Sequence, residues 1–345
     1  MTEQMTTVSG IRATGRLHLG NLLGAVETWV EMQKRGPSFF FIADLHSITT
    51  GFPGREVLHG NRRDIILDLL AVGVDPDVSN VYVQSAVPET VQLAWALGCA
   101  TPVARLMGMH HFAEKKDRLS QLGEDANAGL LTYPVLMTAD ILGPKGTHVP
   151  VGADQRQHVE LARDIARAVN ARAGRDLFPV PEPVFARVDR VPGLGASGKM
   201  SKSEEDTIVY LADGPDVVRR KFLRAPTDPA RARRTDPGDP GRCPVYRFHE
   251  LLCDGEDLRR AADGCRTARI GCVECKAMPV GRINALLAPI QERRRDLEAK
   301  GPGYVDEILE AGSRRARAQI TKTLAELSDL IGLHVPSVPD SWRMS

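Results

Sequence analysis

The sequence predicts an α/β protein with a doubly wound parallel sheet, which carries a helical insertion and is followed by an all-helical domain. Two observations predict the sheet. Strand-like and helix-like hydrophobic patterns alternate through the first half of the chain, as they do in βαβ units. Residues 39–42 (FFFI) are apolar at every position, which is typical of a strand that is buried on both faces. Beyond residue 203 strand patterns fade, and this predicts the helical domain.

The elements follow in order along the chain. Apolar or alternating runs predict strands at residues 6–10, 38–49, 80–86 and 148–152. Helical spacing of apolar residues predicts helices at 19–34, 56–73 and 153–171, and a mostly helical insertion at about 88–142. Glycine and proline predict loops at 191–198 and 226–244, and the last helices are expected at 280–300, 304–320 and 321–331. We therefore expect domains at 1–206 and 207–345, with the last helix able to pack back on the first domain.

Composition limits the class of protein. The 345 residues are 42% hydrophobic and 26% charged, as in soluble globular proteins. No apolar run approaches the length of about 18 residues that a membrane span needs, and the N-terminus lacks the pattern of a signal peptide. These observations favour a cytoplasmic protein with no membrane partner.

Charge is divided along the chain. Residues 1–206 sum to −3 and residues 207–345 to +4. Arginine gathers in the second part, at 231–234, 293–295 and 314–317. Each run alone is most simply a solvated helix face, whereas several runs together favour a surface that faces a polyanion.

A glycine-rich segment, residues 9–21 (SGIRATGRLHLGN), joins the first predicted strand to the first predicted helix. Its glycines permit tight turns, and a helix N-terminus offers unpaired N–H groups to phosphate. The pattern alone is a weak signal, because ordinary tight turns look similar. His18 taken singly could equally be a packing residue.

A second segment, residues 199–203 (KMSKS), ends the predicted glycine-rich loop. Lys199 and Lys202 are three residues apart and can face one anion, while Ser201 and Ser203 add hydroxyl donors. Such a loop can close over a nucleotide and stabilise the charge of a leaving pyrophosphate. A polar surface loop is the alternative.

Residues 18–21 (HLGN) together with 199–203 (KMSKS) resemble the two signatures of class I aminoacyl-tRNA synthetases. Three more segments resemble tryptophanyl-tRNA synthetases, namely residues 43–49 (ADLHSIT), 133–142 (YPVLMTADIL) and 149–158 (VPVGADQRQH). The resemblance extends from residue 9 to the C-terminal helices. It implies a Rossmann-like catalytic domain, a helical anticodon-binding domain, a homodimer, and L-tryptophan, ATP with Mg²⁺ and tRNA(Trp) as ligands.

Asp140 is the residue on which the choice of amino acid depends. It lies in an apolar helical stretch, where an unpaired carboxylate is costly. The resemblance assigns the indole N–H of tryptophan as its donor, whereas a buried arginine or a helix cap is the alternative reading. Met137 lies on the same helix face. The resemblance also places Tyr133, His46 and Gln155 around tryptophan.

The resemblance places further residues around ATP. Gly152 would let the nucleoside approach, and Asp154 would accept from the ribose hydroxyls. Ala153 stands where the family commonly has glutamate. The implied catalytic residues are His18, Lys199 and Lys202. The implied ATP contacts are Arg12, Ala13, Thr14, Gly20, Asn21, Gly152, Ala153, Asp154, Val191, Lys199, Met200, Ser201, Lys202 and Ser203.

Five of the six cysteines fall within 33 positions, which favours a metal site over disulfides in a reducing compartment. Four of them form a set of thiolates in which the last pair has chelating spacing: Cys243, Cys265, Cys272 and Cys275. Spacing alone leaves zinc and a [4Fe–4S] cluster open. The resemblance favours iron–sulfur, because a subset of tryptophanyl-tRNA synthetases has a similar Gly-Cys-Val-x-Cys-Lys segment. Cys253 does not fit the pattern, and Cys99 is expected to be buried.

Two rival functions stay open at this point. A tyrosyl-tRNA synthetase shares the fold, and Asp140 with residues 133–142 argues against it. A non-catalytic RNA-binding or redox-sensing relative would have no physical reason to keep Lys199 and Lys202.

Overall fold

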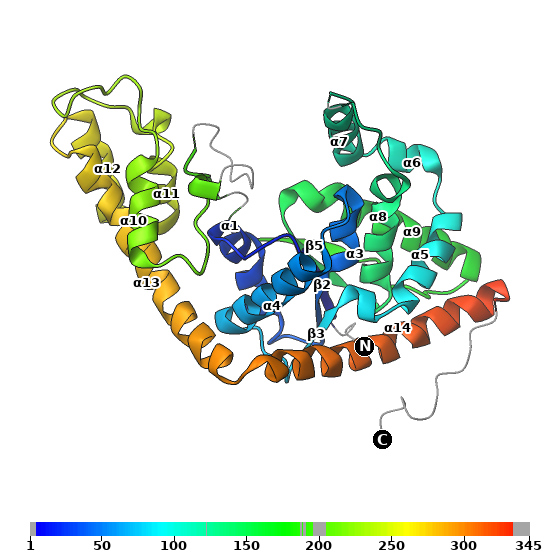
Figure 1. Ribbon diagram of the computed structural model, residues 1–345. Helices are drawn as coiled ribbons and strands as arrows, with labels where there is room; N and C mark the ends of the chain where they lie inside the picture. Colours follow the sequence, from blue (N-terminus) through cyan, green and yellow to red (C-terminus); the bar gives the residue numbers. More distant parts are fainter. Residues whose placement is uncertain (1–4, 122, 187, 189–190, 196–204, 334–345) are drawn as a thin grey trace. The chain divides into compact units, whose positions relative to one another are not determined.

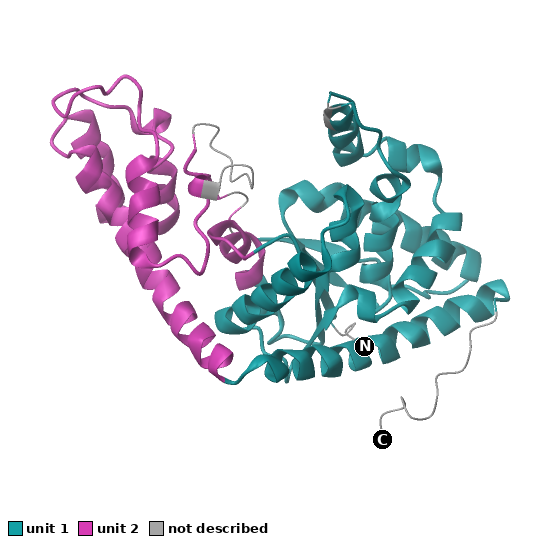
Figure 2. Ribbon diagram, in the orientation of Figure 1, with its two compact units in different colours: residues 1–15, 28–186, 300–345 teal, residues 16–27, 187–299 magenta. Residues whose placement is uncertain are grey.

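The computed structural model describes residues 5–121, 123–186, 188, 191–195 and 205–333. The chain forms two compact units (Figures 1 and 2), both built from separate stretches of sequence. Unit 1 contains residues 1–15, 28–186 and 300–345, and unit 2 contains residues 16–27 and 187–299. These units do not coincide with the domains expected at 1–206 and 207–345, and a domain boundary at residue 206 stays a prediction.

Unit 1 contains a five-stranded sheet in the order β3-β2-β1-β4-β5, with all four pairings parallel. The strands are β1 (Thr7–Arg12), β2 (Ser38–Ala43), β3 (Ser79–Val83), β4 (His148–Val151) and β5 (Glu182–Phe185). The predicted doubly wound parallel sheet is confirmed. Its strand order reverses between β1 and β4, and ligands of such sheets bind outside the carboxyl ends of the strands at that point.

Helices make up most of the remaining described chain. In the first half they are α1 (Leu19–Asn21), the π-helical η1 (Leu22–Val26), α2 (Glu27–Met32), α3 (Asp44–Ser47), η2 (Ile48–Thr50), α4 (Arg55–Val72), η3 (Gln84–Ala86), α5 (Glu89–Cys99), α6 (Val103–Met107), α7 (His110–Gln121), α8 (Ala128–Leu142), η4 (Ala153–Gln155) and α9 (Arg156–Ala173). In the second half they are η5 (Glu205–Thr207), α10 (Pro215–Arg224), η6 (Pro240–Arg242), α11 (Tyr246–Leu252), α12 (Gly255–Arg266), α13 (Cys272–Ala299) and α14 (Pro302–Ile331). No helix among the described residues is long and apolar enough to cross a membrane.

Three local predictions need correction. Residues 44–49 and 84–86 were expected to continue strands, yet both segments turn into helices directly after β2 and β3. Polar residues begin at these points, and their side chains bond across the sheet edge instead of extending the ladder. Strand β5 was not predicted, because the two prolines at 181 and 183 hide its pattern. Residues 302–331 form one helix and not two.

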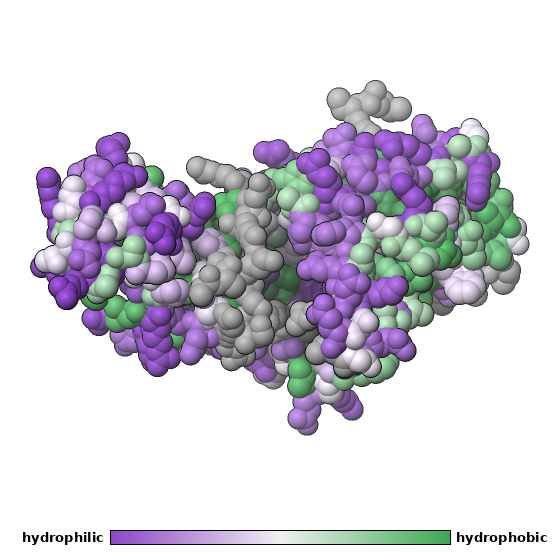
Figure 3. All heavy atoms as spheres, turned by 90° about the horizontal axis from the view of Figure 1, so that it is seen from above, coloured by the Kyte–Doolittle hydropathy of each residue, from purple (hydrophilic) through white to green (hydrophobic). Residues whose placement is uncertain are grey.

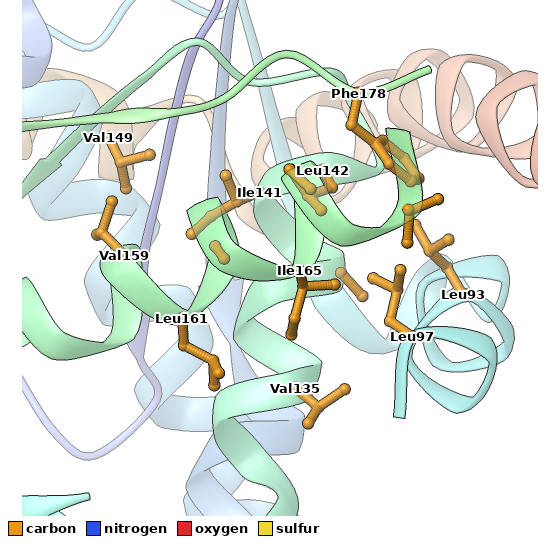
Figure 4. Packing of buried hydrophobic residues seen from close by; sticks show 14 of the residues in the cluster. Leu93, Leu97, Val135, Ile141, Leu142, Val149, Val159, Leu161, Ile165 and Phe178 are labelled. Atoms are coloured by element: carbon orange, nitrogen blue, oxygen red, sulfur yellow. The ribbon is translucent and has the colours of Figure 1, made fainter. Parts of the chain in front are cut away.

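The main core of unit 1 lies between α5, α8 and α9 (Figure 4). Leu93 and Leu97 of α5 point toward Val135 and Ile141 of α8 and Ile165 of α9, and all five side chains are buried. Packing on both sides makes α8 the central helix of this core. A side chain on α8 is therefore held by its neighbours on several sides.

The last helix, α14, packs against β3 and α5 of unit 1. Arg315 donates from Nε to the Asn80 side chain at 2.7 Å and from NH2 to the carbonyl of Pro76 at 3.0 Å. Arg317 pairs with Glu89 at 2.7 Å. These two arginines therefore attach the helix to the sheet, although their run looked like a solvated face in the sequence.

Gly312 marks the closest approach of α14 to the sheet. A Cβ at this position would collide with the backbone of Val81. The backbone of a strand cannot shift as a flexible side chain can, so only glycine fits here.

We predict that Gly312→Ala destabilises the protein by about 1–3 kcal/mol, because the added methyl group forces α14 away from β3. Gly303→Ala on the same helix is the matched control, since a Cβ there meets nothing within 4 Å. It should be neutral or slightly stabilising, because alanine favours helix by about 1 kcal/mol over glycine. Urea unfolding followed by circular dichroism measures both. Equal stabilities for the two variants would contradict this packing.

Candidate active site

Polar side chains gather at the carboxyl ends of the strands in unit 1. Arg12 ends β1, His46 follows β2, Gln84 follows β3, and Asp154 follows β4. The carboxyl ends of parallel strands lie at one edge of the sheet, so these four segments share one edge. Asp140 reaches the same place from α8.

Asp140 is 1% exposed and accepts hydrogen bonds from two protein side chains. Gln84 Nε2 lies 2.9 Å from Oδ1 and 2.8 Å from Oδ2. His46 Nε2 lies 2.9 Å from Oδ2. The sequence left two readings open for this carboxylate, a ligand N–H or a protein partner such as a buried arginine or a helix cap. The structure shows protein donors, but they are a glutamine and a histidine.

Gln84 is held in the orientation that Asp140 requires. Its Oε1 accepts from the backbone N–H of Leu45 at 3.1 Å, which turns Nε2 toward the carboxylate. The neighbouring Asp44 accepts from the Ser85 amide at 3.0 Å. Sequence reasoning missed Gln84. A signal was present, because a residue that directly follows a parallel strand must lie at the ligand-binding edge.

Burial raises the pKa of Asp140, and the hydrogen bond from His46 acts in the opposite direction. The carboxylate can accept about four hydrogen bonds, whereas the two protein donors make three contacts, only one of them to Oδ1. By this count Oδ1 has one acceptor position that no donor among the described residues fills.

Tyr133 lies two helical turns before Asp140 on α8 and bonds to a second buried imidazole. Its hydroxyl lies 2.7 Å from Nε2 of His158 on α9. His158 is 1% exposed, and its Nδ1 has no hydrogen-bond partner among the described residues. Burial raises the pKa of Tyr133 to about 12, and burial with nearby His111 lowers the pKa of His158 to about 4. Both groups are therefore neutral near pH 7. Sequence reasoning missed His158.

Two cations lie beside this group. The Nζ of Lys115, on α7, sits 5.3 Å from the centre of the Tyr133 ring. Burial lowers the pKa of Lys115, and so does the charge of Arg12. The buried Nε of Arg12 has no hydrogen-bond partner among the described residues, and burial lowers its pKa as well. Two neighbouring cations favour an anion between them.

The loop after β1 is held by hydrogen bonds to other residues of unit 1. The Ala13 amide donates to Ser47 Oγ at 2.9 Å, and its carbonyl accepts from Asn61 at 3.0 Å. The Thr14 amide bonds back to the Arg12 carbonyl at 2.8 Å. The Ala13 amide is therefore bonded to α3 and the Thr14 amide to the loop itself. Ala13 can serve a ligand by its small size but not by its N–H.

In unit 2, His18 caps α1. Its Nδ1 accepts from the Asn21 amide at 3.3 Å, and the Asn21 side chain accepts from the His18 amide at 3.1 Å. Because Nδ1 is the acceptor, a neutral His18 ring carries its hydrogen on Nε2. His18 thus presents an N–H donor, with Gly20 in the same helical turn.

The segment after β4 contains Gly152, Ala153, Asp154 and Gln155. A Cβ at Gly152 would lie 2.6 Å from Asp154 Oδ1, so glycine leaves room for the carboxylate. Gln155 Nε2 donates to Asp154 at 2.8 Å. Asp154 is exposed and can accept from a ligand.

Four more residues were predicted to contact tryptophan or ATP. Met137 is half-buried and packs against the core beside α8. Val191, in unit 2, is buried. Lys199 and Lys202, with the rest of residues 199–203, lie outside the described residues.

Four cysteines of unit 2 lie close enough to interact electrostatically. Burial, together with the charges of the nearby Cys243, Cys265 and Cys272, raises the pKa of Cys275 to about 12. Nε2 of the fully buried His249 lies 3.3 Å from Cys275 Sγ. In the part of the chain that the structure describes, however, no three His, Cys, Asp or Glu side chains are grouped as metal ligands.

Two predictions about burial are wrong, one for Arg231 and one for Cys99. Arg231 is buried and not solvated: it donates to the Ile270 carbonyl at 2.6 Å and lies 3.7 Å from Cys265 Sγ. Cys99 is exposed, because it lies on the face of α5 opposite Leu93 and Leu97. The fifth clustered thiol, Cys253, lies 3.6 Å from His249 Nδ1.

Comparison with known proteins defines the class. Residues 1–288 match the family of tRNA synthetases class I (W and Y), to which this chain belongs. Two curated relatives cover almost its whole length. The tryptophan–tRNA ligase of Thermotoga maritima is 40% identical over 331 residues, covering 95% of this chain and 99% of its own. That of Deinococcus radiodurans is 42% identical over 330 residues, covering 94% and 97%.

Solved structures of tryptophanyl-tRNA synthetases are also similar to this chain. The tryptophanyl-tRNA synthetase of Campylobacter jejuni, complexed with ADP and tryptophan, superposes with a TM-score of 0.80 at 31% identity, covering 95% of this chain and 100% of its own. That of Mycoplasma pneumoniae gives a TM-score of 0.79 at 30% identity, covering 96% and 98%. Within its class, this chain belongs to the tryptophan–tRNA ligases.

The buried imidazole predicts a pH dependence of stability. The folded-state pKa of His158 lies at about 4, below the ordinary 6.5. Between these values the unfolded chain binds a proton that the folded chain does not, so stability is full above pH 6.5 and is lost as the pH falls.

The wild-type protein should therefore lose up to about 3 kcal/mol of unfolding free energy between pH 7 and pH 4.5 because of His158. In His158→Gln this part of the loss should be absent. Urea unfolding at both pH values measures it. His59→Gln, an exposed histidine of α4, is the control and should keep the wild-type dependence. An unchanged dependence in His158→Gln would refute the neutral assignment.

Proposed function

We propose that this enzyme activates L-tryptophan with ATP to tryptophanyl-adenylate and pyrophosphate, and then transfers the amino acid to the 3′-terminal ribose of tRNA(Trp). The observation that carries the choice of amino acid is Asp140, a buried carboxylate with one acceptor position left at Oδ1. The indole N–H of tryptophan is the donor that fits it. Phenylalanine has no such donor and would leave that position empty.

Other side chains of unit 1 complete the tryptophan pocket. Met137 and the Tyr133 ring supply apolar surface next to Asp140, and His46 holds the carboxylate from behind. Gln155 and Tyr133 carry the polar atoms for the amino group. Gln84 fixes the direction of Asp140 and so belongs to the pocket.

ATP is bound through phosphate and ribose contacts. The unpartnered Nε of Arg12, close to Lys115, favours an anion at the end of β1. Asp154 accepts from the ribose, with Gly152 leaving the space. His18 offers its Nε2–H to phosphate. Val191 and residues 199–203 are further contacts that the family implies, with Mg²⁺ carried on the triphosphate.

The chemistry requires little acid–base catalysis. The tryptophan carboxylate is already ionised at neutral pH, and it attacks the α-phosphate in line as the bond to pyrophosphate breaks. Catalysis then consists of positioning and charge stabilisation. His18, Lys199 and Lys202 stabilise the charge that moves onto pyrophosphate. The ribose hydroxyl of tRNA then attacks the mixed anhydride and releases AMP.

Asp140→Ala should lower kcat/KM for tryptophan by about 100-fold in ATP–pyrophosphate exchange, because an indole N–H loses its charged partner. Thr138→Ser on the same buried helix is the matched control. The Thr138 hydroxyl donates to the Pro134 carbonyl, a bond that serine can also make, so this variant should keep full activity. The same assay with tyrosine tests the rival specificity. Tyrosine-dependent ATP–pyrophosphate exchange by the wild-type enzyme would contradict the proposal. Unchanged tryptophan-dependent exchange in Asp140→Ala would also contradict it.

We propose further that Cys243, Cys265, Cys272 and Cys275 hold a [4Fe–4S] cluster, with structural zinc as the alternative. The four thiols interact electrostatically, and Arg231 and His249 stand within reach of two of them. N–H groups beside sulfur are typical outer partners of thiolate-bound metals. When bound, the cluster would cross-link the segments that carry these cysteines.

Anaerobically purified protein should be brown, with broad absorbance near 400 nm, which is approximately where thiolate-ligated clusters absorb. Cys275→Ser should lose the band, whereas Cys99→Ser, an exposed cysteine of unit 1, should keep it. Colourless wild-type protein with stoichiometric zinc would overturn the iron–sulfur assignment in favour of the alternative.

The tRNA-facing surface is proposed on unit 2, the anticodon-binding part. Its arginine runs divide into buried members, such as Arg231 and Arg294, and exposed members, such as Arg233, Arg234 and Arg295. Only the exposed members are free to meet phosphate. A cytoplasmic location is the matching expectation, because tRNA is the substrate.

A homodimer is supported by an apolar surface on unit 1. Val91, Trp95, Val103 and Met107 of α5 and α6 are 48–77% exposed. Large apolar side chains gathered in this way mark interfaces, and Figure 3 shows hydrophobic surface at this end of unit 1. We propose that a second copy of the chain covers it.

A further inference from the structure

The bond between Tyr133 and His158 joins two helices of one core. Tyr133 belongs to α8 and His158 to α9, and these helices pack together. The hydroxyl and Nε2 are 2.7 Å apart, and the two rings are tilted by 38° at a centroid separation of 5.2 Å. The Tyr133 hydroxyl is therefore fixed in place by a side chain that is itself buried.

Only one hydrogen lies between the two atoms, because both groups are neutral near pH 7. In one arrangement the hydroxyl donates to Nε2, and the phenol oxygen keeps its lone pairs for another partner. In the other arrangement Nε2–H donates to the oxygen, and the hydroxyl hydrogen points elsewhere. The two arrangements present opposite polarity to a ligand.

Charges around the pair favour the first arrangement. The titratable groups that face it are Arg12 of β1, His46 of α3, His111 and Lys115 of α7, and Asp154 of η4. Arg12 and Lys115 are both cations, and Asp154 is the single carboxylate among them. A mainly positive surrounding stabilises oxygen lone pairs and repels a hydroxyl hydrogen.

We propose that His158 is a positioning residue for tryptophan activation: it accepts the Tyr133 hydroxyl hydrogen, so that the phenol oxygen presents lone pairs to the α-ammonium of tryptophan. The inference rests on the proposed tryptophan pocket and adds a residue that does not touch the substrate. In this role the imidazole carries its hydrogen on Nδ1, an atom that has no hydrogen-bond partner among the described residues.

Calorimetric binding of two ligands tests the proposal. Tryptophan carries the α-ammonium, and indole-3-propionate has the same ring and carboxylate without it. His158→Phe should raise the Kd of tryptophan by roughly tenfold and leave the Kd of indole-3-propionate within about twofold. His158→Gln, whose Oε1 can accept the same hydrogen, should restore most of the tryptophan affinity.

Tyr133→Phe provides the second variant, because it removes the hydroxyl without touching His158. It should weaken tryptophan by a similar factor, and adding His158→Phe to it should have no further effect. Equal weakening of both ligands by His158→Phe, or by Tyr133→Phe if His158→Phe does not fold, would show a packing role and overturn the inference. Wild-type protein that fails to bind tryptophan would instead overturn the proposed function.

Discussion

A buried carboxylate is the constraint around which the active site of this enzyme is arranged. Asp140 sits on α8 with almost no exposure to solvent, where an unpaired charge would cost several kcal/mol. The chain meets this cost by ending two strands early. β2 and β3 give way to short helices, from which His46 and Gln84 turn back to the carboxylate.

The rest of unit 1 holds this arrangement rigid. α5 and α9 pack on both sides of α8, and α14 braces β3 from outside through Gly312 and Arg315. Gln84 is fixed in turn by the Leu45 amide. A carboxylate held from several directions keeps one acceptor position open in a fixed direction, which is what recognition of a single N–H requires.

The sequence predicted the sheet well, because its strands are continuous apolar runs between helical patterns. It predicted Asp140 for a sound reason, the cost of a buried charge, but not its protein partners. His158 carries no pattern of its own, and only the fold brings it to Tyr133. Gln84 is marked by its place directly after a strand, but only the fold shows that Asp140 is its partner. Strand β5 and the exposure of Cys99 were missed because prolines hide the first and helix orientation decides the second. Arg231 shows the same limit, since a run of arginines does not reveal which member is buried.

The most direct measurement of the central claim compares tryptophan with its isostere in which sulfur replaces the indole nitrogen. The two ligands have nearly the same shape, and they differ in the N–H that Asp140 is proposed to accept. Calorimetry with the wild-type enzyme should give an affinity for the isostere at least about tenfold weaker, and the difference should vanish in Asp140→Leu. Equal affinity of the wild-type enzyme for both ligands would contradict the account.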